Sequence, residues 1–208
     1  MTLSEFDREY SKHFRVVCGC DEAGRGPLAG DVFAAAVVFD DNTVIEGIND
    51  SKKLTEKKRE QLFDEIKQKA LFWSIKTASV EEIENLNILN AAMLAMKRAI
   101  EDLAVVPDIC LIDGNKTPVV DVKTEAVVKG DAKSQSIAAA SILAKVARDR
   151  YMLMLSKQYP QYQFEKHKGY GTKLHYQMID EYGPCEIHRP SFLKKYYAKL
   201  SEHQQKNG

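Results

Sequence analysis

The sequence predicts an α/β fold, in which apolar strands and amphipathic helices alternate along the chain. Apolar runs such as residues 28–39 indicate buried strands. Residues 88–103 place apolar side chains at helical spacing, and a strand that ends at Asp113 follows. A helix followed by such a strand is the β-α-β arrangement that gathers strand ends along one edge of a sheet. Short helical segments and basic loops follow Pro160, so we expect an α/β core and a helical C-terminal part.

The remaining elements are predicted from the same patterns in chain order. An apolar strand over residues 15–20 is expected to pair with residues 28–39 as a hairpin. Further strands are expected over residues 71–78, 107–113 and 119–128. Helices are expected over residues 55–70, 88–103, 131 to about 155, 172–182 and from 188 onward. Residues 79–84 are expected to form a short capped turn.

The stretch 18–30 contains two adjacent carboxylates and a glycine-rich turn. Asp21 and Glu22 follow an apolar strand, where a buried carboxylate is costly unless it is paired, hydrogen-bonded or bound to a metal. The turn Gly24-Arg25-Gly26 lets backbone N–H groups approach an anion. Carboxylates beside such a turn are what metal-dependent phosphoryl chemistry requires. Acidic residues at a strand end are also common in surface turns, so this stretch alone leaves both interpretations open.

The glycine pattern differs from two common phosphate-binding loops. A P-loop requires a lysine and a hydroxyl residue after its second glycine, and the sequence has neither there. A dinucleotide-binding loop opens a helix, whereas Pro27 and a strand-like run follow this turn. A nucleotide-binding kinase or GTPase is therefore disfavoured.

Two more aspartates follow later strands of the predicted sheet. Asp113 ends an apolar strand, so it is expected to lie near Asp21 and Glu22 at one sheet edge. Asp131 precedes the long helix, where it is either an N-cap or a further member of the carboxylate group. The first turn of that helix offers donors to a phosphate. These donors are Lys133, Ser134 and Ser136.

Two basic segments are candidates for contact with a polyanion. Lys52 and Lys53 precede a helix, and taken alone this segment favours an ordinary capping region over a phosphate contact. Lys168 and Tyr170 belong to the loop 167–172, in which glycines flank the tyrosine. An exposed aromatic ring in a basic loop is typical of stacking on a sugar or base.

Composition and charge limit the class of protein. The 208 residues are 44% hydrophobic and 29% charged, which is typical of a globular protein without membrane-spanning segments. The net charge is zero, but residues 131–208 carry 13 Lys and Arg against 7 Asp and Glu, a net charge of +6. The basic C-terminal part could face a polyanion. The cysteines at positions 18, 20, 110 and 185 are not spaced along the sequence as the ligands of a zinc site are. Reduced thiols and a cytoplasmic location are therefore expected.

Several motifs occur together and in a fixed order. They are Asp21-Glu22-Ala23-Gly24-Arg25-Gly26-Pro27-Leu28-Ala29-Gly30, Asp50-Ser51-Lys52-Lys53-Leu54, Ile112-Asp113-Gly114, Lys129-Gly130-Asp131-Ala132-Lys133-Ser134, His167-Lys168-Gly169-Tyr170-Gly171-Thr172 and His188-Arg189-Pro190-Ser191-Phe192. Over residues 15–197 the sequence thereby resembles bacterial ribonuclease HII. Ribonuclease HIII is a weaker match, because its extra N-terminal domain has no counterpart in this sequence.

The resemblance implies a ribonuclease H-like fold with a central mixed sheet flanked by helices. We expect residues 1–160 to form the catalytic core and residues 161–208 a helical, substrate-binding extension packed in the same domain. The implied enzyme is a metal-dependent endonuclease that cuts the RNA strand of RNA–DNA hybrids. It would also nick duplex DNA on the 5′ side of embedded ribonucleotides, leaving 5′-phosphate and 3′-hydroxyl ends, in DNA replication and repair and the removal of RNA primers.

The resemblance also assigns roles to the candidate residues. Asp21, Glu22, Asp113 and Asp131 would hold two Mg²⁺ or Mn²⁺ ions. The turn Gly24-Arg25-Gly26 would hold the ribonucleotide's 2′-hydroxyl and its flanking phosphates, and Tyr170 would stack at the RNA–DNA junction. Further contacts to the nucleic acid are expected from Lys52, Lys53, Lys133, Ser134, Ser136 and Lys168. A monomer without membrane contact is expected.

Two other classes compete with this interpretation. Another two-metal nuclease of related fold would not need both Arg25 between glycines and Tyr170 in its loop. A non-catalytic hybrid-binding module is expected to lack a carboxylate, and all four are present.

Overall fold

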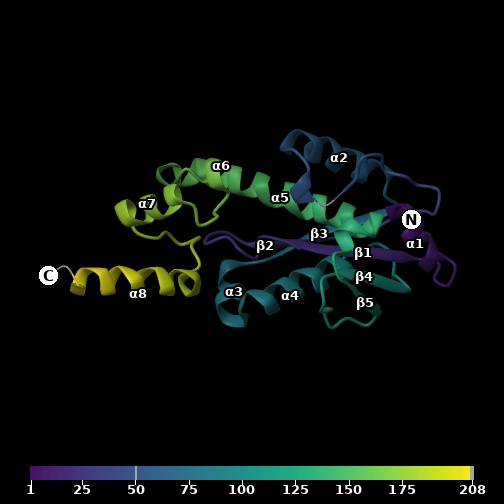
Figure 1. Ribbon diagram of the computed structural model, residues 1–208. Helices are drawn as coiled ribbons and strands as arrows, with labels where there is room; N and C mark the ends of the chain where they lie inside the picture. Colours follow the sequence, from purple (N-terminus) through teal and green to yellow (C-terminus); the bar gives the residue numbers. More distant parts are fainter. Residues whose placement is uncertain (50, 207–208) are drawn as a thin grey trace.

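A five-stranded mixed sheet forms the centre of the molecule (Figure 1). The computed structural model describes residues 1–49 and 51–206. The strand order is β3-β2-β1-β4-β5; β1 pairs antiparallel with β2 and parallel with β4. The strands are β1 (Val17–Ala23), β2 (Val32–Val38), β3 (Phe72–Ala78), β4 (Ile109–Asp113) and β5 (Lys123–Val127). The predicted α/β fold and its hairpin are confirmed.

Helices cover both faces of the sheet because β2 is apolar on both sides. Ala34 and Ala36 pack in the core under α4 (Ile88–Glu101), while Phe33 and Ala35 pack under α2 (Glu56–Lys69) and α5 (Gln135–Gln158). This alternation follows the two-residue period of a strand. In Figure 1, α5 and α2 lie on one side of the sheet, and α4 with α3 (Val80–Leu86) lies on the other.

The long helix α5 approaches β1 unusually closely. A Cβ atom added to Gly19 would lie 2.2 Å from the backbone carbon of Ser136. Only glycine fits under this part of the helix, and the buried alanines that follow, 138–140, keep the helix near the sheet. The first turn of α5 is thereby fixed over the strand that carries Asp21.

The C-terminal part is helical and lies at one end of the molecule (Figure 1). Its elements are η3 (Pro160–Tyr162), α6 (Phe164–His167), α7 (Lys173–Tyr182) and α8 (Pro190–Lys206). Leu28 packs with Ile179 and Leu193, and Ala29 packs with residues of η3 and α6. The loop after β1 is therefore the surface against which this part folds. Among the described residues, no helix combines the length and apolar character needed to cross a bilayer.

One helix was not predicted, and three local predictions are wrong. The first helix, α1 (Leu3–Ser11), was not predicted, although Thr2 and Glu5 form a capping box at its start. Residues 79–84 were expected as a turn and instead begin the helix α3, which Ser79 caps. The other two errors concern β1 and α5, as follows.

Strand β1 continues to Ala23, so Asp21 and Glu22 lie within the strand rather than beyond its end. Asp131 lies in the short helix η2 (Gly130–Ala132), and Ser134 is the N-cap of α5.

Cysteines 18, 20 and 110 are buried free thiols, as expected.

Candidate active site

Parallel pairing of β1 with β4 brings two aspartates to the same edge of the sheet. Cys20 pairs with Ile112, so Asp21 and Asp113 come one residue later on each strand. Asp113 Oδ1 accepts hydrogen bonds from the backbone N–H groups of Gly130 at 2.6 Å and Asp131 at 3.3 Å. These bonds hold η2 against the end of β4. The expected proximity of Asp21, Asp113 and Asp131 follows from this geometry.

Among these carboxylates, Asp21 lies in surroundings that strongly disfavour its ionised form. It is buried, with 5% of its surface exposed. Burial raises the pKa of Asp21 well above its usual value, and the charges of Glu22 and Asp113 raise it further. The opposing contacts are hydrogen bonds, from Ser141 and from the backbone N–H of Glu22 at 2.7 Å. A cation placed near Asp21 would therefore favour its charged form.

The carboxylates supply the type of ligand that a hard divalent cation prefers, because such ions bind oxygen atoms. Their side chains do not yet surround one: in the described part of the chain no three His, Cys, Asp or Glu groups form a ready metal cluster. Glu22 Oε1 lies 3.2 Å from Arg25 Nη1, and Asp113 faces the backbone of η2. Rotation of these two side chains toward Asp21 would be needed to enclose a cation.

Two buried arginines fix the glycine-rich loop that follows β1. Arg189 donates to the carbonyls of Gly24 at 2.8 Å, Pro27 at 2.8 Å and Gly30 at 2.6 Å. Arg148 donates to Ala29 at 3.1 Å and to Lys168 at 3.1 Å. The loop carbonyls are thus turned inward. Arg25 and Gly26 remain exposed at the surface of the loop.

Gly24 is required at its position for two reasons. Its φ of +103° lies in the region that glycine favours, and an added Cβ would lie 2.3 Å from Arg148 Nε. The loop and the buried arginine are therefore fitted to each other.

A cleft of about 530 Å³ lies beside this loop. Tyr170 is 40% exposed and contributes its ring to the cleft wall, with Lys145 and Arg148 about 5.6 and 5.7 Å from the ring centre. The cleft is lined by Glu22, Ala23, Gly24, Arg25, Gly26, Ser51, Lys52, Ile88, Ser141, Lys145, Tyr170 and Phe192. Glu22, the glycine-rich turn, Lys52 and Tyr170, predicted separately from the sequence, therefore meet in one cleft.

Some of the predicted phosphate donors have other roles in the structure. Ser134 is buried and accepts from the N–H of Ile137 as the cap of α5. Ser136 is buried, and its N–H and hydroxyl donate to Asp7 Oδ2 at 2.8 and 2.7 Å. In the structure a carboxylate from α1 therefore occupies the start of the helix, and a phosphate contact from these serines stays a prediction.

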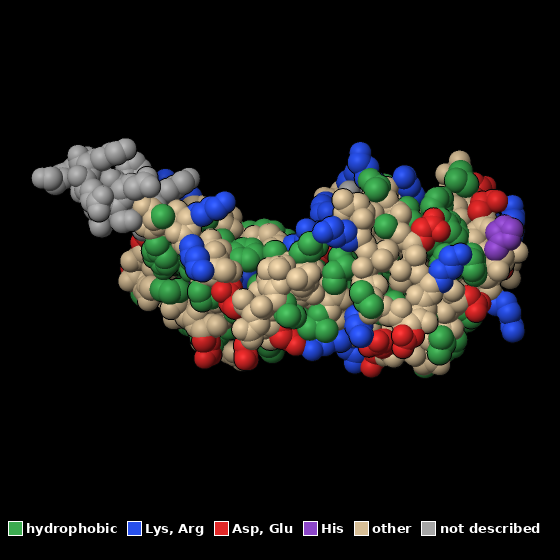
Figure 2. All heavy atoms as spheres, turned by 90° about the horizontal axis from the view of Figure 1, so that it is seen from below, with side chains coloured by type: hydrophobic (Ala, Val, Ile, Leu, Met, Phe, Trp, Pro, Cys, Tyr) green, Lys and Arg blue, Asp and Glu red, His purple; other side chains and the backbone are tan. Residues whose placement is uncertain are grey.

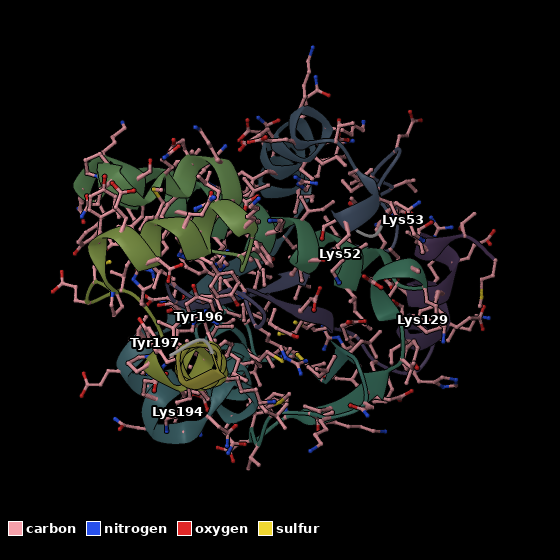
Figure 3. The ribbon with its side chains drawn as sticks, turned by 60° about the vertical axis from the view of Figure 1, so that its left-hand side comes forward. Lys52, Lys53, Lys129, Lys194, Tyr196 and Tyr197 are labelled. Atoms are coloured by element: carbon pink, nitrogen blue, oxygen red, sulfur yellow. The ribbon has the colours of Figure 1, made fainter. Side chains whose placement is uncertain are left out.

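The predicted lysines are distributed over different surfaces. Lys53 and Lys133 are exposed. Figure 3 shows Lys52, Lys53 and Lys129 on one side of the molecule. Lys168 Nζ donates to the Glu165 carbonyl, so it supports its own loop instead of the cleft. Asp50, part of the same motif as Lys52, lies outside the described residues.

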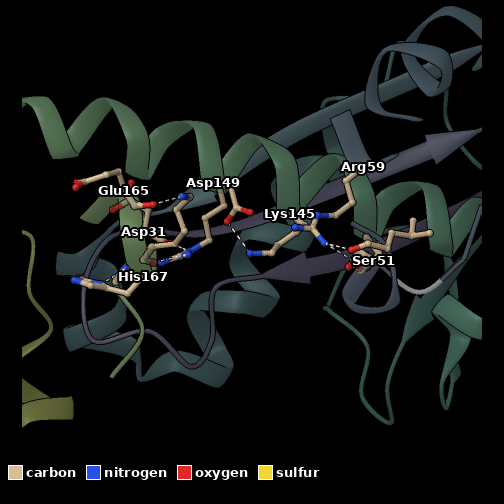
Figure 4. A network of polar contacts seen from close by, with 12 residues as sticks. Asp31, Ser51, Arg59, Lys145, Asp149, Glu165 and His167 are labelled. Atoms are coloured by element: carbon tan, nitrogen blue, oxygen red, sulfur yellow. Dashed lines mark hydrogen bonds and ion pairs between the residues drawn. The ribbon is translucent and has the colours of Figure 1, made fainter. Parts of the chain in front are cut away.

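Sequence reasoning missed the buried basic residues. Lys145 pairs with Asp149 at 2.7 Å (Figure 4). Arg148 and Arg189 are fully buried. One signal was available in the sequence: Arg148 follows an alanine-rich, apolar part of α5. An arginine there indicates a buried charge, and a buried charge needs hydrogen-bond acceptors around it.

These features define a protein of the ribonuclease H class: a mixed sheet, acidic residues at the ends of neighbouring parallel strands, and a basic cleft beside them. The ribonuclease H2 of Pyrococcus horikoshii OT3 has a similar structure, with a TM-score of 0.70 and 27% identity over 85% of this chain and 93% of that chain. The ribonuclease HII in a complex with PCNA from Archaeoglobus fulgidus gives a TM-score of 0.69 and 25% identity over 84% and 94%.

Sequence comparison defines the family. The Ribonuclease HII family model matches residues 18–195. Ribonuclease HII of Caldicellulosiruptor bescii is 59% identical over 181 residues, which cover 87% of this chain and 88% of that protein. Ribonuclease HII of Idiomarina loihiensis is 57% identical over 187 residues, 89% of this chain and all of that protein. The chain belongs to the ribonuclease HII family, and the predicted fold and ribonuclease H endonuclease activity are confirmed.

Proposed function

We propose that this chain uses divalent cations to nick duplex DNA on the 5′ side of embedded ribonucleotides and to cut the RNA strand of longer hybrids. The products would be a 5′-phosphate and a 3′-hydroxyl. The observation that supports this most directly is Asp21, a buried carboxylate between two others, beside a basic cleft. A group in that environment favours bound cations, and cations there would meet the phosphate of a polynucleotide in the cleft.

Asp21, Glu22, Asp113 and Asp131 would hold the metal ions, and two Mg²⁺ or Mn²⁺ ions fit the number of carboxylates. When bound, such ions supply Lewis-acid activation of water and stabilisation of the departing oxygen. The protein contributes position: Asp113 Oδ1 orders the backbone of η2, and Gly19 lets α5 lie close behind the carboxylates. Arg25, released from Glu22, would be available to a phosphate.

The ribonucleotide would be recognised by two structures on the cleft wall. Gly24-Arg25-Gly26 offers backbone close to a 2′-hydroxyl, the group that distinguishes RNA from DNA. Tyr170 offers a ring for stacking at the junction. Lys52 and Lys53, which lie on one side of the molecule (Figure 3), would contact phosphates of the same duplex.

The surrounding assignments follow from the same proposal. Residues 1–160 would form the catalytic core and residues 161–208 its substrate-binding extension, which is supported by the packing of Leu28 and Ala29 on the C-terminal helices. The protein would act as a monomer in DNA replication and repair. The cleft would hold the nucleic acid on which it acts. A cytoplasmic location is supported by the free thiols, which suit a reducing compartment.

The test uses a labelled DNA duplex with one ribonucleotide, incubated with Mg²⁺, with Mn²⁺ and with EDTA. We expect a nick on the 5′ side of the ribonucleotide with either metal and none with EDTA. Cleavage of long hybrids alone would contradict the role of Tyr170 at the junction. No cleavage with either metal would favour a hybrid-binding module.

Asp113→Asn provides the matched variant for this test. The amide oxygen can still accept from Gly130 and Asp131, so η2 is expected to stay in place. Losing the charge should reduce cleavage by roughly 100-fold or more while hybrid affinity changes by less than about threefold. A parallel loss of affinity would show that Asp113 acts in binding or folding instead.

A further inference from the structure

Three buried histidines lie beneath the loop that carries Tyr170, and the proposed chemistry gives them no role. His167, His175 and His188 are 6%, 0% and 2% exposed. The rings of His167 and His175 stack with their centres 4.3 Å apart, and the centres of His175 and His188 are 5.2 Å apart. Phe164 packs against all three. The histidines form a small aromatic core of the C-terminal part.

Their hydrogen-bond partners determine where each proton lies. The backbone N–H of Cys185 donates to His188 Nδ1 at 2.9 Å, so a neutral His188 carries its proton on Nε2. That proton points to His175 Nε2 at 3.0 Å. His175 must then carry its own proton on Nδ1, which lies 3.0 Å from the carbonyl oxygen of Tyr170. The bonds run in one direction, from Cys185 to Tyr170.

His167 fixes the other side of the same loop. Its Nδ1 accepts from the backbone N–H of Gly169 at 3.2 Å, and its Nε2 donates to the carbonyl of Tyr162 at 2.9 Å. Each imidazole nitrogen thus has a partner, and within the described residues the group does not form a metal site. The histidines hold backbone groups directly before and at Tyr170.

The loop has little freedom to adopt another position. A Cβ on Gly169 would lie 2.8 Å from the carbonyl oxygen of Ala29, and one on Gly171 would lie 3.0 Å from the hydroxyl of Tyr176. The N–H of Leu28 donates to the Gly169 carbonyl at 2.8 Å. The position of Tyr170 is therefore tied to the glycine-rich loop that follows β1.

His188 and the next residue serve both loops. Arg189 holds the carbonyls of Gly24, Pro27 and Gly30, while His188 reaches Tyr170 through His175. A backbone bridge between Ala29 and His188 joins the two sets of contacts. The dipeptide at 188–189 can thus set the distance between the turn Gly24-Arg25-Gly26 and the ring of Tyr170.

We propose that His188, His175 and His167 are positioning residues that hold Tyr170 at a fixed distance from Gly24-Arg25-Gly26, so that both meet one ribonucleotide junction. The inference rests on the proposed function, because it assigns these histidines to substrate reading. They are not among the carboxylates that would hold the metal ions, so they are not assigned a catalytic role.

Amide replacements separate the two bonds of His175. Asparagine places its amide near the position of Nδ1, so His175→Asn keeps a donor for the Tyr170 carbonyl. Glutamine reaches the position of Nε2, so His175→Gln keeps an acceptor for His188 and loses the donor to Tyr170. On a duplex with one ribonucleotide, we expect kcat/KM to fall about tenfold in His175→Gln and less than about threefold in His175→Asn.

A second comparison separates positioning from general damage. In a Tyr170→Ala background, His175→Gln should change kcat/KM by less than about twofold, because the ring that it positions is gone. Equal effects of Asn and Gln, or a full additional loss in the Tyr170→Ala background, would overturn the inference.

Circular dichroism first establishes that each variant is folded. If His175→Gln does not fold, His167→Gln replaces it, since it keeps a donor for Tyr162 and loses the acceptor for Gly169. An inactive wild-type protein would refute the proposed function and this inference together. Active wild type with unaffected His175→Gln would refute the inference alone.

Discussion

At the scale of single residues, Arg189 connects stability with substrate reading. Its guanidinium group serves several carbonyls of one loop, and burial lowers its pKa to about 9, so it remains charged at neutral pH. A lysine ammonium has no planar fork to reach the same acceptors. We expect Arg189→Lys to lower the free energy of unfolding by about 3 kcal/mol, measured by urea denaturation.

The control for this prediction is Arg150→Lys. Arg150 forms an exposed ion pair with Glu60, and such pairs contribute about 0–1 kcal/mol. Similar losses in the two variants would mean that burial of Arg189 has no special importance.

Single residues could be proposed from the sequence where the chemistry is local. Asp21 and Glu22 were proposed because two carboxylates directly after an apolar strand need a compensating partner, and Tyr170 because glycines flank it in a basic loop. The contact of Ser136 with Asp7, 129 positions away along the chain, was not predicted. No local pattern encodes that contact.

At the scale of elements, α1 serves to hold the start of α5. Asp7 Oδ2 accepts from the N–H and the hydroxyl of Ser136, while its other oxygen is buried and has no hydrogen-bond partner among the described residues. We expect Asp7→Ala to lower the free energy of unfolding by about 1–2 kcal/mol, as for loss of a helix cap. Asp7→Asn keeps an acceptor oxygen and should cost less.

Glu9→Ala on the same helix is the matched control, because Glu9 forms only an exposed pair with Lys12. Thermal unfolding of the three variants provides the comparison. Equal losses from Asp7→Ala and Asp7→Asn would contradict a capping role.

The C-terminal elements should also give the protein a defined response to acid. Burial lowers the pKa of His175 and of His188 from 6.5 to about 4. The unfolded chain therefore binds protons at these sites before the folded chain does. Their contribution to stability is complete above pH 6.5 and is lost as the pH falls toward 4.

Urea denaturation at a series of pH values between 7 and 4 tests this response. The slope of the unfolding free energy with pH should be shallower in His188→Gln than in the wild type. Other titratable groups face the two histidines, namely His167, Cys185 and Tyr162, and Glu165 and Lys168 face His167 in turn. An unchanged slope would show that these neighbours, and not His188, control the response.

At the scale of the whole molecule, the sheet was easier to predict than the C-terminal part. Alternating apolar residues indicate a strand that is buried on one face, and continuous apolar runs indicate a strand that is buried on both faces. The C-terminal helices are held by Arg189 and by the histidines, whose acceptors are backbone carbonyls in distant loops. Backbone acceptors leave no trace in side-chain patterns, so this arrangement could not be predicted from the sequence.

The distribution of charge leads to a prediction for nucleic-acid binding. The net charge of +6 on residues 131–208 balances an acidic remainder. Figure 2 shows the molecule hollowed beside the C-terminal helices, with Lys and Arg side chains along the edge of the hollow. Binding there should weaken as salt rises, because the protein displaces counterions from the phosphates.

Lys52 lines the cleft and Lys53 follows it in the chain, so the two lysines test whether that edge of the cleft contacts the duplex. We expect the double variant Lys52→Gln/Lys53→Gln to reduce the slope of log K against log salt concentration by about 0.9 for each lysine that contacts a phosphate. The measurement is fluorescence anisotropy of a labelled hybrid with Ca²⁺ in place of Mg²⁺, at salt concentrations between about 50 and 200 mM.

Lys69→Gln is the control for this slope. Lys69 ends α2 beside Leu71, whose N–H donates to the carbonyl of Val38. Val38 pairs with Cys18, at the opposite end of β1 from Glu22. Removing a charge there changes the net charge of the protein without approaching the cleft. A slope that falls equally in Lys69→Gln would mean that overall charge drives binding, whereas a fall confined to the Lys52/Lys53 variant would locate the phosphate backbone on that edge.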